Sequence, residues 1–91
     1  MTVKTQCINF EIAKQLEEFI TKKTGRLERH LKADDELEIR LTVIKPQTHT
    51  NKEAEVKLGS LFVKKTADSF EEALSTCFDA LESGLERRKN N

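Results

Sequence analysis

The spacing of hydrophobic and polar positions changes along this chain, and the changes mark its elements. Residues 2–8 alternate weakly, which favours a first strand. From Ile12 the apolar side chains recur at helical spacing and predict one amphipathic helix over about residues 12–32. The apolar stripe of this helix consists of Ile12, Leu16, Phe19, Ile20, Leu27 and Leu31. Thr24 stands at the edge of the stripe, where a larger side chain is expected, so we expect loose packing near it.

Three later segments alternate as half-buried strands do. Residues 36–45 alternate most regularly, with Leu, Ile and Val on one side and mostly charged residues on the other. A polar loop over 46–51 follows, and its Pro46 ends strand pairing because it has no N–H to donate. Residues 53–58 and 61–67 alternate again.

Only Gly59 and Ser60 separate the last two predicted strands. Gly at the first position of a two-residue loop favours a type II′ hairpin. That register pairs Leu58 with Leu61 and Val56 with Val63 on the core side. It leaves Phe62 on the outer face, either as an exposed or covered apolar residue or as an aromatic ring that stacks on a base.

A second helix is predicted to begin at Ser69, with Glu72 completing a capping box. Its apolar face consists of Phe70, Ala73, Leu74, Cys77, Phe78, Leu81 and Leu85. The predicted order is β-α-β-β-β-α, an α+β fold with two helices packed on one face of a four-stranded sheet. We expect one core, built from Leu16, Ile20, Leu27, Leu41, Val43, Val56, Phe70, Leu74, Phe78 and Leu81.

Composition limits the class of protein. The 91 residues suffice for one domain, predicted over 1–91, and the formal net charge is zero. The N-terminal segment has no basic start followed by an apolar run, and no apolar stretch approaches the roughly 18 residues that cross a bilayer. Cys7 and Cys77 stand far apart without a C-x-x-C motif, which favours reduced thiols and a cytoplasmic protein that does not bind membranes.

The sequence shows no pattern that supports catalysis. His30 and His49 have no Ser or Cys at a motif spacing, and no second His or Cys recurs four residues from either. The three glycines stand alone, so no phosphate-binding loop is present. We therefore expect no enzyme activity, no metal, no cofactor and no small-molecule substrate. His30 is expected to be packed or partly exposed at the margin of the first helix's apolar stripe.

Positive charge gathers in one stretch, TKKTGRLERHLK, over residues 21–32. On a helix Lys22, Arg26 and Arg29 fall within about 60° of one another, beside the apolar stripe. Three cations about one turn apart suit a row of RNA phosphates, and we expect acidic residues to lie away from this edge. A solvated helix face is the alternative.

Four motifs carry a resemblance to a known family: F-E-I at 10–12, L-x-x-F-I at 16–20, R-L-E-R-H at 26–30 and D-x-F-E-E-A at 68–73. In this order and spacing, the chain resembles the bacterial ribosome hibernation-promoting and ribosome-associated inhibitor family, in its short form. The resemblance covers essentially the whole chain and implies the same β-α-β-β-β-α fold.

The resemblance implies a translation inhibitor that is not an enzyme. Such proteins dock on ribosomal RNA in the decoding channel of the small subunit, where mRNA and tRNA bind, and inactivate idle ribosomes under stress. It implies contacts from Lys23 and Arg26, helped by Lys22 and Arg29, and from Arg87, reinforced by Arg88 and Lys89. Where this chain has Ala80 and Ser83 the family usually has basic residues, which removes two phosphate partners. A monomer is expected off the ribosome, with ribosomal proteins as further contacts.

Two other functions fit parts of the pattern. A double-stranded RNA-binding module requires α-β-β-β-α order and a Lys-rich start to the last helix, whereas this helix begins S-F-E-E. A relative of the hibernation family with weakened RNA affinity, acting as a protein-interaction module, is favoured by the zero net charge and by Ala80 and Ser83.

Overall fold

The computed structural model describes residues 1–44 and 50–89, without the side chains of Arg88 and Lys89. The observed order is β-α-β-β-β-α, as predicted, with one extra 3-10 turn, η1. The elements are β1 (Thr2–Ile8), α1 (Lys14–Leu27), η1 (Glu28–His30), β2 (Glu36–Val43), β3 (Lys52–Leu58), β4 (Leu61–Ala67) and α2 (Phe70–Lys89). Most of the predicted 46–51 loop, including Pro46 and His49, lies outside the described residues.

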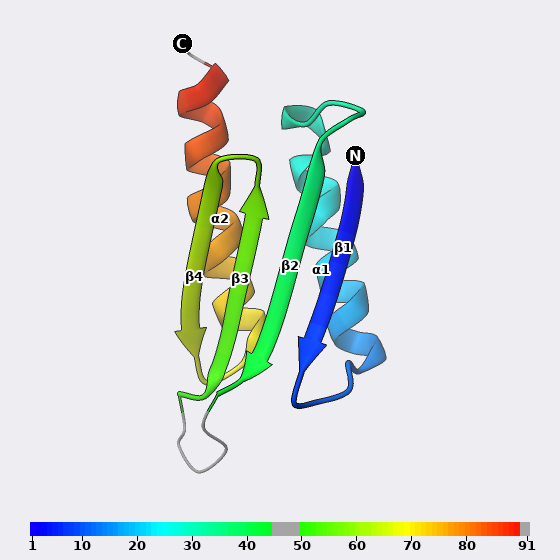
Figure 1. Cartoon of the computed structure of the whole chain (residues 1–91), viewed down its shortest axis with the longest axis vertical. Coiled ribbons are helices and arrows are strands. Elements are labelled where there is room, and N and C mark those ends of the chain that lie inside the picture. Colours follow the sequence, from blue (N-terminus) through cyan, green and yellow to red (C-terminus); the bar gives the residue numbers. More distant parts are fainter. Residues whose placement is uncertain (45–49, 90–91) are drawn as a thin grey trace.

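The four strands form one mixed sheet in the order β1-β2-β3-β4. β1 runs parallel to β2, with Thr2 opposite Glu36, and the other neighbours are antiparallel. Both helices lie on the same side of the sheet, behind it in Figure 1, with α1 behind β1 and β2 and α2 behind β3 and β4. The predicted α+β architecture is therefore confirmed.

The hairpin between β3 and β4 has the predicted register. Leu58 lies opposite Leu61, and Val56 lies opposite Val63. Gly59 has φ +58°, the conformation that the first loop residue of a type II′ turn requires and that glycine adopts without strain. The turn chemistry therefore fixes which side chains of these strands face the helices.

One hydrophobic core lies between the sheet and the helices. Nine of the ten predicted core residues are buried in it, and Val43 packs against it half-buried. The strands add further fully buried side chains, among them Leu37, Ile39 and Leu58. At the start of α2, the backbone N–H of Glu72 donates a hydrogen bond to Ser69 Oγ at 3.1 Å, so Ser69 caps this helix as predicted.

The first helix is shorter than its apolar pattern predicts. It begins at Lys14, after Ala13 with extended backbone (φ −82°, ψ 152°), and it ends at Leu27. The next three residues tighten into η1, and Leu31 is extended again (φ −114°, ψ 150°). A turn follows in which the N–H of Lys32 donates to Asp35 Oδ2 at 2.8 Å. This local bond competes with helical bonding, so the helix does not reach the predicted residue 32.

A hollow of about 570 Å³ lies between β1 and α1. Its lining includes Val3 and Cys7 from the strand and Ile20 and Thr24 from the helix. The Thr24 side chain is buried, and its hydroxyl donates to the Thr21 carbonyl at 3.0 Å. The expected loose packing around Thr24 is therefore present.

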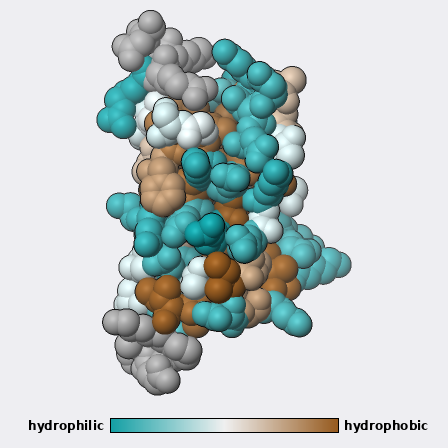
Figure 2. All heavy atoms as spheres, viewed as in Figure 1, coloured by the Kyte–Doolittle hydropathy of each residue, from teal (hydrophilic) through white to brown (hydrophobic). Residues whose placement is uncertain are grey.

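The sheet face opposite the helices carries charged side chains and is mostly hydrophilic in Figure 2. Lys4 pairs with Glu36 at 3.1 Å, and Arg40 pairs with Glu55 at 3.5 Å. Phe62 is 56% exposed on this outer face, as its register predicts. Within residues 1–44 and 50–89, neither helix is long and apolar enough to cross a membrane.

Candidate nucleic-acid interface

Helix α1 and the turn η1 that follows it present a basic stripe, which we define as Lys22, Lys23, Arg26 and Arg29. Lys22 and Arg26 are exposed. Lys23 is half-buried, and its Nζ lies 5.4 Å from the centroid of the Phe19 ring. This cation–π contact holds the ammonium group against the helix and reduces its conformational freedom. The stripe therefore combines two solvated cations with one that is already positioned.

Arg29 lies in η1 and not in the helix itself. Its Nη2 is 3.4 Å from Glu82 Oε1 on α2, and its Nε donates to His30 Nε2 at 3.3 Å. The Arg29 side chain is 73% exposed and that of Glu82 is 23% exposed. An ion pair in such a solvated position contributes at most about 1 kcal/mol, so Arg29 can exchange this partner for another anion.

Acidic side chains of α2 line the seam between the two helices. Lys23 and Arg26 border a small hollow there together with Asp79 and Glu82. The expectation that acidic residues lie away from the basic edge is therefore wrong. The cause is tertiary: the seam brings residues near position 80 against residues near position 26, a pairing that helical spacing alone does not show.

The second predicted anchor is described only in part. Arg87 is exposed near the end of α2, while the side chains of Arg88 and Lys89 lie outside the described part of the chain. Ala80 is half-buried and Ser83 is exposed, so this stretch of α2 offers no cation at either position.

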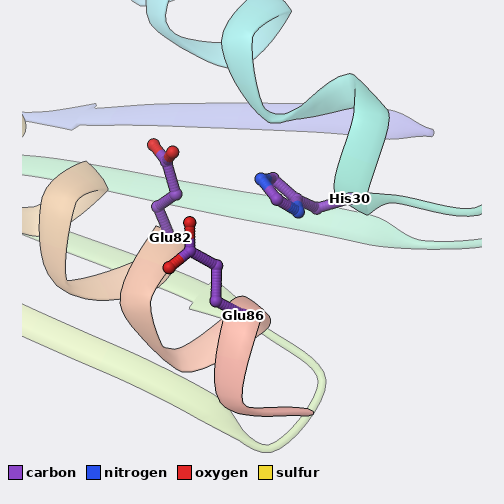
Figure 3. A group of neighbouring side chains, drawn as sticks. All are labelled: His30, Glu82 and Glu86. Carbon is purple, nitrogen blue, oxygen red and sulfur yellow. The ribbon is translucent and has the colours of Figure 1, made fainter. Parts of the chain in front are cut away.

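The structure also brings together three residues that the sequence pattern did not connect. One ring nitrogen of His30 and one carboxylate oxygen each from Glu82 and Glu86 lie within 4.8 Å of one another. Figure 3 shows the imidazole on the segment after α1 facing the two glutamates on α2. The part of this group that the sequence could indicate was the pair of glutamates, which stand four residues apart on one helix. The histidine comes from the other helix region, so no local spacing could include it.

Both cysteines have free thiols, as expected. Burial raises the pKa of the Cys77 thiol to about 11. Burial, together with the charge of Glu17, raises the pKa of Cys7. Since the thiolate is the reactive form, neither thiol has the character of a nucleophile.

Together, the β-α-β-β-β-α fold and the basic stripe define a small α+β domain with a cationic helical edge. The family described as "Sigma 54 modulation protein / S30EA ribosomal protein" matches residues 3–91. The chain belongs to this family, and its resemblance to the hibernation-promoting proteins is confirmed.

Two solved structures share the fold. The N-terminal domain of Protein Y from Thermus thermophilus is 20% identical, with a TM-score of 0.76, and the match covers 96% of this chain and 98% of that one. A ribosomal subunit interface protein from Coxiella burnetii is 18% identical, with a TM-score of 0.74, and the match covers both chains completely. None of the curated proteins compared with this chain matches it.

Proposed function

We propose that this protein is a non-enzymatic translation inhibitor of the cytoplasm that binds the small ribosomal subunit. It docks on ribosomal RNA in the decoding channel, overlaps the places of mRNA and tRNA, and keeps idle ribosomes inactive under stress. The observation that carries the proposal is the basic stripe on α1 and η1, with Lys22, Arg26 and Arg29 exposed, in a chain that belongs to a ribosomal protein family.

The stripe has the charge that such docking needs. Among the described residues, no acidic side chain lies within 4 Å of the charged groups of Lys22 or Arg26, so both can contact phosphates without losing an ion pair. Charges screen one another over about 8–10 Å at physiological salt, so RNA responds to the near edge more than to the neutral whole. A rigid helix can follow phosphates and the shape of folded RNA without reading its sequence.

A second function is favoured by the acidic seam. Glu82 partly neutralises Arg29, and Ala80 and Ser83 supply no charge. These features fit a relative with weakened RNA affinity that acts through protein contacts. The two functions differ in how steeply subunit binding depends on salt.

The test replaces Arg26 and Arg29 together by Gln, a residue of similar helix propensity. Each base that meets one phosphate contributes about one unit to the log–log dependence of affinity on salt. We expect the double variant to bind small subunits more weakly, with a slope shallower by about two units. Binding is measured at several salt concentrations, alongside thermal unfolding to show that the fold is intact.

The matched control is Arg40→Gln with Lys57→Gln, which removes two positive charges from the opposite face of the sheet. It should leave both affinity and slope close to those of wild type. Equal binding by both double variants would refute contact through α1. A shallow slope for wild type itself would favour the protein-interaction module.

A further inference from the structure

We propose that His30, Glu82 and Glu86 form a binding site for Zn²⁺ at the seam between η1 and α2. The three ligand atoms lie within 4.8 Å of one another. In a tetrahedral site with bonds of about 2.0–2.2 Å, two ligand atoms of one zinc are about 3.3–3.6 Å apart, so the three side chains must approach one another by roughly 1 Å. Glu86 is exposed and Glu82 half-buried, and long side chains in these positions can make that adjustment by rotating (Figure 3).

The histidine provides an observation independent of the glutamates. Its Nδ1 is buried from solvent, and it has no hydrogen-bond partner among the residues that the structure describes. The other nitrogen, Nε2, accepts a hydrogen bond from Arg29 Nε, so in the neutral ring Nδ1 carries the proton and lacks an acceptor. A buried donor without a partner is costly, and coordination of the metal by Nδ1, with the proton moved to Nε2, would remove that cost.

The two glutamates also have little positive charge beside them to offset their own. Residues four apart on a helix lie side by side, and two like charges in this arrangement destabilise it by a few tenths of a kcal/mol. The only cation within 4 Å of either carboxylate, among the described residues, is Arg29 beside Glu82. A divalent cation between the glutamates would turn this repulsion into coordination.

Arg29 and the metal compete for the His30 ring. If zinc binds Nε2, it takes the place of the Arg29 Nε–H donor. If zinc binds Nδ1, the proton moves to Nε2, which then can no longer accept from Arg29. In both cases Arg29 loses its hydrogen bond to His30, and its 73% exposed side chain is free to leave the seam. If the proposed function holds, zinc therefore releases one more cation for RNA.

The donor set selects the kind of ion. One imidazole nitrogen and two carboxylate oxygens suit Zn²⁺, and three protein ligands leave a fourth position for water. Mg²⁺ prefers six oxygen ligands and retains its waters, so it fits this set poorly.

Calorimetric titration of the chelator-treated free protein with Zn²⁺ tests the site. We expect one equivalent to bind wild type, with a rise in Tm because the ion binds only the folded chain. We expect Mg²⁺ to bind at least about tenfold more weakly. Glu86→Gln should weaken Zn²⁺ binding at least tenfold, and its exposed position makes a folding defect unexpected. Glu71→Gln, an exposed charge removal on the same helix, is the matched control and should bind as wild type does.

Arg29→Gln should raise the affinity for Zn²⁺ above that of wild type, because it removes the cation that competes with the metal. Arg26→Gln is its control and should cause a smaller gain. The site is refuted if wild type takes up no zinc, or if Glu86→Gln and Glu71→Gln bind it equally. Unchanged affinity in Arg29→Gln would contradict the competition between Arg29 and the metal. No ribosome is present in these titrations, so their failure leaves subunit binding by the metal-free protein untouched.

Discussion

The two helices cover the same sheet, but they are packed very differently. Eight of the described residues of α2 are buried, and Gly84 is one of them. A methyl group added at Gly84 would meet Leu61 Cδ2 at 3.2 Å. Helix α1 buries four residues and borders a hollow of about 570 Å³. The tightly packed helix supports the domain, whereas the loosely packed one carries the basic stripe. Stability and the proposed binding are therefore assigned to different helices.

The largest expected effect is on the core beneath α2. Leu74 is fully buried, and Leu74→Ala should lower the free energy of unfolding by about 3–5 kcal/mol, since it leaves a cavity that close neighbours cannot fill. Leu16 of α1 lies beside looser packing and is 6% exposed, so Leu16→Ala should cost about 2–3 kcal/mol. Urea unfolding measures both. Equal losses would show that the two helices support the fold equally.

Each half of the molecule contains one cysteine, so the reactivity of the two thiols can compare how readily each half opens locally. Cys7 is half-buried beside the hollow, and Cys77 is fully buried on the side of α2 that faces the sheet. In the folded protein a thiol reagent should modify Cys7 at least about tenfold faster than Cys77, whose pKa of about 11 also keeps the thiolate scarce.

The rates are separated with Cys7→Ser and Cys77→Ser. Reductant should leave the Tm unchanged, because both thiols are free. Faster modification of Cys77 than of Cys7 would reverse the proposed order of local stability.

The smallest effect concerns two helical glycines. A Cβ at Gly25 would meet nothing within 4 Å, so Gly25→Ala should stabilise the protein by about 0.5–1 kcal/mol through helix propensity. Gly84→Ala makes the same change in α2, but the added methyl must displace Leu61, so its gain should be smaller. Thermal unfolding distinguishes them, and a larger gain at Gly84 would contradict the difference in packing.

Much of this fold could be predicted because its signals are local. Alternation in 36–45, the Gly59–Ser60 turn and the Ser69 cap each depend on neighbouring residues, and each was confirmed to within a few positions. The end of α1 was missed because the apolar stripe continues to Leu31 while the backbone follows the Lys32–Asp35 turn.

The candidate site was less predictable because its decisive contacts join distant segments. The charges of α1 were visible at helical spacing, but the approach of Glu82 to Arg29 depends on how two helices meet across the core. The same holds for His30 beside Glu86. Spacing within one helix shows which side chains share a face, and it does not show what that face meets.

The parallel pairing of β1 with β2 has a consequence for how the chain is made. A ribosome synthesises Thr2 well before Glu36, the residue that lies opposite it in the sheet. Until β2 has emerged, β1 has no neighbour, and the apolar stripe of α1 has no surface to cover. The later strands can instead pair as soon as each turn is complete, because antiparallel neighbours are adjacent in the chain. Helix α1, which carries most of the basic stripe, thus leaves the ribosome before β2, β3 and β4, and its apolar side must wait, unburied, for the rest of the sheet.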